Sequence, residues 1–238
     1  MRSLISSLGA ACALWLITSG AQAQYVPRIW DLMLGVPIKE LPLNDYVDPA
    51  CGTNGGPPAR VLKSWDEFSV CPKEAETGLH EVWFRYDDEM EYVARARRSE
   101  ILIRQYQANA LNGQPIVTSL LFDDKGVMQG FRVVNDLRVD GRTRLNAFGL
   151  GDLFKGMAGV GLECTDLPAA EGERPIEDWF IKENCELKAP DGTITRVQTR
   201  RFYKPGQYAV DPNDARLNEN EFESSARLEV FRSSGGVH

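Results

Sequence analysis

Four cysteines carry the clearest chemistry that the sequence offers after its first 23 residues. They close two segments of similar length, because Cys51 and Cys71 are 20 residues apart and Cys164 and Cys185 are 21 apart. Zinc sites and thiol redox pairs need closely spaced ligands such as CxxC, and the chain has no such spacing. An even number of cysteines in an exported chain instead indicates structural disulfides. Of the three pairings that four cysteines allow, the matched spacing favours Cys51–Cys71 and Cys164–Cys185.

Acid–base catalysis has few candidates in this chain. Apart from the terminal His238, His80 is the only histidine, and the chain has no GxSxG nucleophile motif. We therefore interpret His80 as a structural residue. Carboxylates gather in two places: Asp87, Asp88, Glu89 and Glu91, and then Asp123 with Asp124. Two carboxylates at the right separation hydrolyse glycosides, whereas carboxylates in turns and helix starts ordinarily accept backbone N–H bonds. We favour the second role and keep a carboxylate-dependent hydrolase as the alternative.

Two segments resemble metal or cofactor loops without meeting their requirements. Segment 211–222 has the acidic spacing of a calcium loop, but Arg216 stands where the loop needs glycine and Phe222 where it needs glutamate. The glycines after Cys51 lack the Gly-Lys-Ser/Thr that completes a phosphate-binding loop. We therefore expect no metal, no cofactor and no catalytic residue.

Arginines next to aromatic residues offer candidate binding positions. One basic group is Arg95, Arg97 and Arg98, and a second lies along segment 194–204 beside Phe202. Such a group can bind an anionic or carbohydrate component, but a solvated strand face with ion pairs across strands explains it as well. The candidate binding residues are Trp83, Arg85, Arg200, Arg201 and Tyr203.

The first 23 residues have the pattern of a secretory signal peptide. Arg2 is the positive start, Leu8–Ile17 an apolar core too short to span a bilayer, and Ala21-Gln22-Ala23 a peptidase site. Cys12 raises a lipoprotein alternative, but it lies inside the apolar core. We expect cleavage before Gln24 and a periplasmic or secreted protein.

The mature chain is acidic. Loss of Arg2, the only charged residue of the leader, moves the formal net charge from -7 to -8. Such a chain has no reason to bind nucleic acid or anionic lipid. No later apolar run approaches membrane length, so we expect no membrane insertion after cleavage.

Short helices and antiparallel strands are expected to position these residues. Apolar spacing predicts short helices over 34–43 and 60–68, and a helix is favoured over a strand for 91–109. The clearest local signal is a hairpin around the turn Asp123-Asp124-Lys125-Gly126. Alternating and β-branched residues predict strands over 79–87, 116–122, 127–134, 194–203 and 226–231.

The two halves of the chain share anchors at a nearly constant offset. Leu34 and Leu150 differ by 116, Cys51 and Cys164 by 113, and Trp65 and Trp179 by 114. This favours an internal duplication, with chance similarity between two disulfide loops as the alternative of equal weight. We therefore predict an α+β protein of two possibly duplicated lobes, each with short helices on a small antiparallel sheet and one local disulfide. The lobes would span 24–145 and 146–232, followed by a disordered tail over 233–238.

The order of elements resembles one known family. The helix start Leu34-Gly35-Val36-Pro37 and the hairpin are similar to those of the small helix–helix–sheet domains of envelope lipoproteins of the BamE type. The resemblance implies no function and transfers no residue.

These observations favour an exported, non-catalytic binding or accessory protein of the cell envelope. Its partner would be an envelope protein or a small ligand. A hydrolase acting on cell-wall or polysaccharide material is the alternative. A third hypothesis, a structural subunit of a larger envelope complex, predicts an exposed apolar patch around Trp30 and segment 25–34.

Overall fold

A computed structural model describes residues 27–204, 209–210, 217–218 and 222–232. The predicted signal peptide, the predicted tail and most of segment 211–222 lie outside these residues. The strands are β1 Tyr46–Cys51, β2 His80–Tyr86, β3 Ala110–Leu111, β4 Gln114–Phe122, β5 Met128–Asn135, β6 Glu163–Asp166, β7 Ile181–Lys188, β8 Thr193–Tyr203, β9 Ala209–Val210, β10 Leu217–Asn218 and β11 Phe222–Arg232. The α-helices are α1 Glu89–Ala96, α2 Glu100–Gln105, α3 Gly141–Leu145 and α4 Leu150–Ala158. Short 3-10 turns are η1 Ile29–Asp31, η2 Ile38–Glu40, η3 Leu43–Asp45, η4 Trp65–Val70 and η5 Ala147–Gly149.

One antiparallel sheet of nine strands dominates the described part of the chain, in the order β1-β2-β4-β5-β11-β8-β7-β6, with β3 beside β4. The predicted hairpin is confirmed as β4 and β5, and Gly126 in its turn has φ +73°. Both favoured disulfides are confirmed, with Cα–Cα distances of 5.1 Å for Cys51–Cys71 and 3.9 Å for Cys164–Cys185. The protein is therefore an α+β fold with two disulfides.

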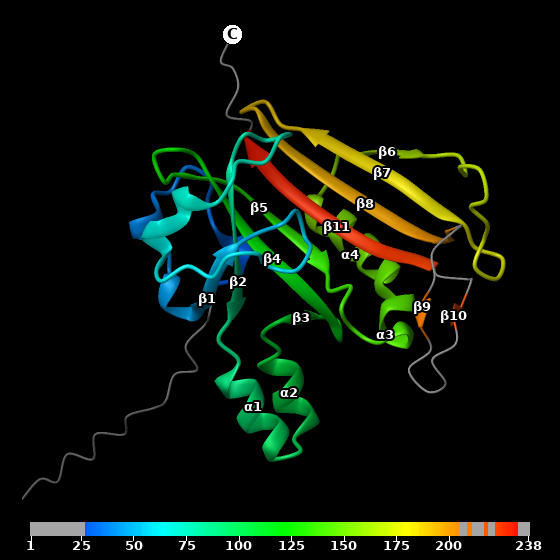
Figure 1. The fold of residues 1–238 in the computed structure, drawn as a ribbon, viewed down its shortest axis with the longest axis horizontal. Coiled ribbons are helices and arrows are strands. Elements are labelled where there is room, and N and C mark those ends of the chain that lie inside the picture. Colours follow the sequence, from blue (N-terminus) through cyan, green and yellow to red (C-terminus); the bar gives the residue numbers. More distant parts are fainter. Residues whose placement is uncertain (1–26, 205–208, 211–216, 219–221, 233–238) are drawn as a thin grey trace, which may run out of the picture.

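The structure does not show two duplicated lobes. The last strand, β11, lies between β5 and β8, so the sheet is continuous from one half of the sequence to the other (Figure 1). The repeat anchors also lie in unlike surroundings, because the exposed fraction is 9% for Trp65 and 59% for Trp179. Cys51–Cys71 closes a loop over the 3-10 turn η4, whereas Cys164–Cys185 joins directly paired residues of β6 and β7. Similar spacing along the chain thus does not correspond to similar structure.

The two faces of the sheet differ in what covers them. Val82, Phe84, Val133, Val197 and Leu228 belong to the main apolar core, on what we call the covered face. The turns of the N-terminal segment and helix α4 pack against that core, which also contains Ile29, Ile38, Leu150 and Phe154. Helix α4 approaches closely: a Cβ at Gly151 would lie 2.2 Å from the hydroxyl of Thr199 on β8. The alternate residues of the same strands, including Arg132, Arg196 and Glu229, occupy the opposite face, which we call the polar face.

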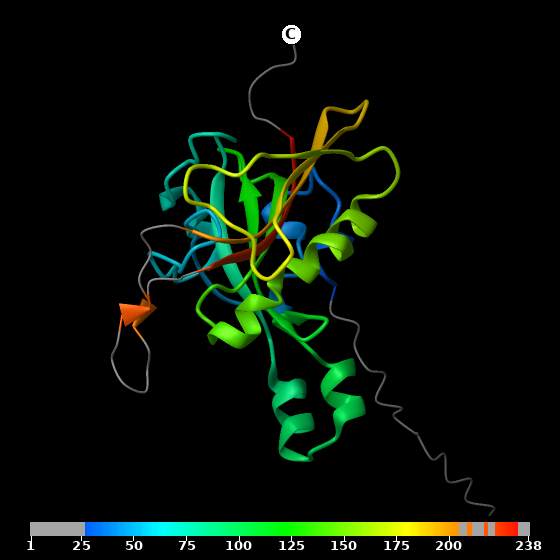
Figure 2. The ribbon, with the colours of Figure 1, turned by 90° about the vertical axis from the view of Figure 1, so that its right-hand side faces the viewer.

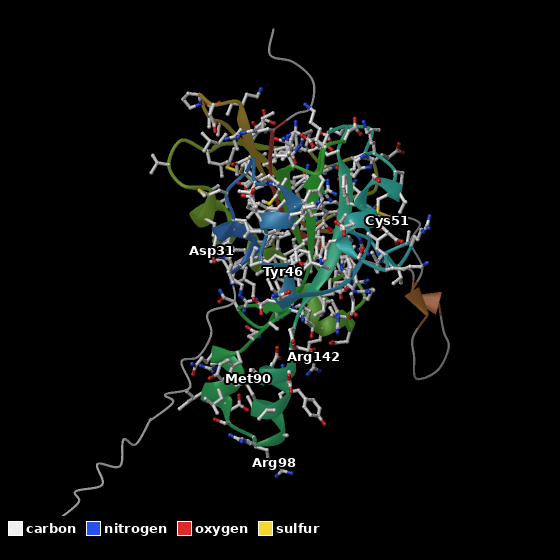
Figure 3. The ribbon with its side chains drawn as sticks, turned by 90° about the vertical axis from the view of Figure 1, so that its left-hand side faces the viewer. Asp31, Tyr46, Cys51, Met90, Arg98 and Arg142 are labelled. Carbon is white, nitrogen blue, oxygen red and sulfur yellow. A yellow bond between two sulfur atoms is a disulfide. The ribbon has the colours of Figure 1, made fainter. Side chains whose placement is uncertain are left out.

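Helices α1 and α2 form a short pair that projects from the body of the protein (Figure 2). Figure 3 places Met90 and Arg98 on this pair, away from the buried Tyr46. The segment predicted as one helix is thus two, separated at Arg98, which has φ +52°. The predicted helix over 60–68 is replaced by η4, which starts at Trp65 because Gly55, Gly56, Pro57 and Pro58 leave the preceding loop irregular.

Candidate functional site

An apolar cleft lies on the covered face, with a volume of about 510 Å³. Three elements form it: the N-terminal segment, the end of α4 and the central strands. Its apolar lining is Trp30, Leu32, Met33, Leu34, Phe131, Met157, Ala158, Leu228 and Val230. Ligand sites in proteins have this character, with a concave apolar wall and a few placed polar groups.

Strand periodicity and helix periodicity together place these side chains. Leu228 and Val230 are two residues apart on β11, so both face the same side of the sheet, and Val230 pairs directly with Phe131 of β5. Leu150 and Phe154 bury one side of α4, which brings Met157 and Ala158 of its last turn to the edge of the cleft. On the opposite wall, Met33 keeps an exposed fraction of 75%. The apolar surface is therefore open to solvent at its mouth.

Polar groups gather at one end of the cleft. These are Thr193 and Thr195 at the start of β8 and Arg232 at the end of β11. The guanidinium of Arg232 donates to Asp191 over 2.6 Å and to the hydroxyl of Thr193 over 3.2 Å. The backbone N–H of Thr193 and the Arg232 guanidinium lower the pKa of Asp191 to about 2. The cleft thus has an apolar body and a rim that carries a cation.

A second concavity, the trough, lies on the polar face and has a volume of about 870 Å³. Strand β6 forms one wall, and the loops that follow Cys51 and Cys71 form the other through Asn54 and Glu76. The strands contribute Glu163, Thr165, Asn184, Glu186, Lys188, Arg196, Gln198, Arg227 and Glu229. Its lining is therefore mostly polar and charged.

One row of paired residues crosses the trough from strand to strand. Glu163 pairs with Glu186, Glu186 with Arg196, Arg196 with Glu229, and Glu229 with Arg132. Within the row, Arg196 donates to Glu186 over 2.7 Å and also bonds Glu76 of the opposite wall. The hydrogen bond from Arg196 lowers the pKa of Glu186. Charges of opposite sign thus satisfy one another along most of the row.

The buried end of the row is a cluster around Arg132. Its guanidinium contacts Glu74 at 2.7 Å, Glu81 at 2.8 Å and Glu229 at 2.6 Å, and its side chain is only 3% exposed. Burial alone would lower the pKa of Arg132, but the hydrogen bond with Glu74 and the charges of Glu81 and Glu229 raise it overall. Burial likewise opposes ionisation of Glu229, but the hydrogen bond from Arg227 and the nearby Arg132 lower the pKa of Glu229. The cluster holds ions in fixed pairs and ties the loop containing Glu74 to the sheet.

The predicted binding residues do not converge on one site. Trp83 and Arg85 lie on β2, whereas Arg200, Arg201 and Tyr203 lie on β8, and β4, β5 and β11 separate the two strands. Four strand spacings correspond to about 19 Å. Along β8, Arg200 and Arg201 also point to opposite faces, because they are neighbours in a strand.

Several of these side chains already have protein partners. Arg85 donates to Asp48 over 3.0 Å, and Arg200 donates to Asn184 over 2.5 Å. Arg201 is 5% exposed and bonds the carbonyl of Ile176 over 2.7 Å, with the rings of Phe148 and Trp179 against its guanidinium. Arg85, Arg200 and Arg201 are thus each bonded within the protein.

His80 and the predicted carboxylate groups take part in local bonding. The ring of His80 bonds the carbonyl of Cys71 over 2.6 Å and the carboxylate of Asp124 over 3.1 Å. Asp123 accepts backbone N–H bonds from Lys125 and Val127 in the hairpin turn, and Asp87 accepts one from Glu89 at the start of α1. Asp123 and Asp87 thus accept backbone N–H bonds, as expected of carboxylates in turns and helix starts, whereas Asp124 bonds the side chains of His80 and Lys73.

Sequence reasoning missed the Arg132 cluster, although it left a signal. Glu81 and Arg132 stand inside strands whose neighbours are apolar, and Glu229 interrupts the run from Leu228 to Phe231. A charge among buried strand residues requires a buried partner, so these residues could have been matched as a set. The third hypothesis predicts an exposed apolar patch around Trp30; in the structure Trp30 lines the cleft, and Met33 of the same segment is 75% exposed.

No family model, curated protein or solved structure matches this chain, so the resemblance to BamE-type lipoproteins has no match to support it. None of the helices in the described ranges is long and apolar enough to cross a membrane.

Proposed function

We propose that this chain is an exported, non-catalytic binding protein of the cell envelope that holds the apolar part of a small amphipathic ligand in the cleft. The observation that carries the proposal is the cleft itself: about 510 Å³, with apolar walls from three separate elements and polar groups only at one end. The volume of the cleft lies within the range of small-molecule sites. Arg232 on the rim is paired with Asp191, and its further N–H groups can donate hydrogen bonds to the polar end of the ligand.

Export is supported by two independent features. The first 23 residues read as a signal peptide, and the chain holds two disulfides. Disulfides persist in oxidising compartments such as the periplasm and are rare in the cytosol.

The ionisation of the carboxylates favours a binding role over the alternative role of a hydrolase. A glycosidase needs one carboxylic acid that stays protonated near neutral pH, which requires a raised pKa. Among the described residues, every Asp or Glu whose pKa clearly departs from its ordinary value is lowered, including Glu186 and Glu229 in the trough. Hydrogen bonds and paired cations stabilise their ionised forms.

Binding of N-phenyl-1-naphthylamine, an apolar dye that fluoresces when it leaves water, tests the proposal. The mature protein should give a saturable rise in fluorescence. Met157→Lys places a charge at the cleft and should weaken dye binding at least tenfold, because burying an ammonium beside apolar groups costs more than about 1.4 kcal/mol. Met90→Lys makes the same change on the projecting helix pair, where Met90 is 54% exposed, and should leave binding unchanged. Equal binding by the two variants, or no saturable signal, would contradict the proposal.

A further inference from the structure

In the part of the chain that the structure describes, no strand pairs with the outer edge of β6, which forms a wall of the trough. β6 ends the order of the main sheet and pairs only with β7 among the strands described. All four of its residues, Glu163 to Asp166, are exposed. A free edge presents unpaired backbone N–H and C=O groups to which another extended chain can bond.

The register identifies which backbone groups face outward. The N–H of Leu167 donates to the carbonyl of Lys182 over 2.6 Å, so backbone groups at Leu167, and by alternation at Thr165 and Glu163, point toward β7. Between two such hydrogen-bonded pairs, Cys164 and Cys185 form a non-hydrogen-bonded pair, in which the strands come closer, with a Cα–Cα distance of 3.9 Å. The N–H and C=O of Cys164 and Asp166 therefore point away from the sheet and are available to a new strand.

The second disulfide keeps this edge in place. A four-residue strand at the end of a sheet has few contacts of its own, and β6 is joined covalently to β7 through Cys164 and Cys185. A chain that adds to the edge consequently meets a strand that is already ordered, which reduces the entropy lost on binding.

Charge selects the kind of chain that fits. Glu163 points into the trough and Asp166 to the other side, and within the described ranges neither carboxylate has an ion-pair partner. The neighbouring cation in the trough, Arg196, is already bonded to Glu186 and Glu76. A second copy of β6 carries no cation, so it would leave both carboxylates without a partner of opposite charge. A cationic strand has the complementary charge.

We propose that β6 binds an extended, basic segment of a partner protein, which adds to the sheet as a further strand. The segment bonds the outward backbone groups of Cys164 and Asp166. It places one cationic side chain opposite Glu163, over the trough, and a second opposite Asp166, so its two cations are three residues apart. This edge is formed by β6, whereas the cleft is lined by residues of β5, β11 and the start of β8, so its use does not depend on the ligand proposed there.

The test uses the oxidised mature protein and the blocked peptide Ac-Val-Lys-Thr-Val-Lys-Thr-NH2, with calorimetry and the amide NMR signals of Cys164 and Asp166 as readouts. The peptide should bind, and the two outward amides should become protected from hydrogen exchange. Methylating the backbone nitrogens of its second and fourth residues removes strand bonding but keeps both charges, and it should abolish binding. The same peptide with Glu in place of both Lys should not bind.

Variants of the protein separate backbone from charge. Asp166→Pro removes one outward N–H together with the carboxylate and leaves the bonds to β7, because proline is tolerated on edge strands. It is compared with Asp166→Asn, which removes the charge alone: the proline variant should abolish binding, and the asparagine variant should only weaken it. Glu163→Gln with Asp166→Asn should weaken binding about five- to tenfold, as expected for two exposed ion pairs. The proposal would be overturned if the methylated peptide bound the wild-type protein as tightly as the unmethylated one, or if the lysine peptide did not bind. Self-association of the protein through β6 would also overturn it.

Discussion

Replacing Arg132 by methionine should destabilise the protein strongly at neutral pH. Arg132 is the cation shared by Glu74, Glu81 and Glu229. In the variant, Glu229 keeps Arg227 at 2.6 Å, but Glu81, whose side chain is 2% exposed, loses its cation. Removing one partner of a buried ion pair typically costs about 3–5 kcal/mol, because a charge stays buried without compensation. For a chain of this size, that loss corresponds to a fall in Tm of roughly 6–20 °C.

Urea unfolding followed by tryptophan fluorescence, with both disulfides intact, measures this loss. Arg85→Met is the matched control: its ion pair with Asp48 is 44% exposed, so the loss should stay below about 1 kcal/mol. Adding Glu81→Gln to Arg132→Met should restore at least half of the lost free energy, because it removes the unpaired charge. A loss under about 1 kcal/mol for Arg132→Met would refute the account of the cluster.

The same variant should reverse part of the pH dependence. In the wild type the pKa of Glu229 is lowered, so its contribution is complete above the unfolded pKa of about 4.3 and is lost as pH falls through the folded value. In Arg132→Met, the ionised carboxylate of Glu81 stays buried without a cation, which destabilises the folded protein most at the pH values where carboxylates are ionised. The free energy of unfolding of the variant should therefore increase as pH falls from 7 to 5. Parallel pH profiles for the two proteins would contradict this reasoning.

Three further predictions concern the framework. Gly151→Ala should lower the free energy of unfolding by about 1–3 kcal/mol, because the new Cβ would overlap Thr199. Gly156→Ala in the same helix meets no atom within 4 Å, so it should raise the free energy of unfolding by about 0.5–1 kcal/mol. Thermal unfolding compares the two variants, and equal changes would show that α4 does not dock as described. Replacing Cys51 and Cys71 by alanine should lower the free energy of unfolding by about 3 kcal/mol, because the unfolded chain loses a covalent closure of 20 residues. Urea unfolding measures this loss, and an unchanged midpoint would count against a structural role of the disulfide. In carbon NMR, the Asp191 carboxyl should titrate near pH 2 in the wild type and at a higher pH in Arg232→Met. An ordinary pKa of Asp191 in the wild type would contradict its contacts with Thr193 and Arg232.

Local signals predicted the strands, the hairpin and the disulfides well, whereas the helices predicted over 60–68 and 91–109 were replaced by a 3-10 turn and two shorter helices. The Asp123–Gly126 turn fixed the hairpin of β4 and β5, and the matched spacing identified both disulfides. Alternation located β2, β8 and β11 to within a few residues. Each of these inferences depends on residues that are neighbours in the chain.

Contacts between distant segments were not predictable in the same way. The alternation in Ala226–Phe231 indicates a strand but does not name its neighbours, so its insertion between β5 and β8 was missed. The equal spacing of Trp65 and Trp179 from the following cysteines suggested equivalent positions, yet one is buried among aromatic rings and the other is exposed. The cleft and the trough depend on this long-range pairing, which is why the predicted binding residues fell on separate strands.

Carbon NMR of the methionine methyl groups tests the proposed cleft most directly. Four methionines follow residue 23: Met33 and Met157 line the cleft, Met90 lies on the projecting helix pair, and Met128 is fully buried in the core. Sodium decanoate, added below the concentration at which it forms micelles, supplies an apolar chain with an anionic end. The proposed function predicts saturable shifts for Met33 and Met157, with Met90 and Met128 unchanged. Shifts confined to Met90, equal shifts at Met90 and the cleft methionines, or no shift at any of the four would contradict it.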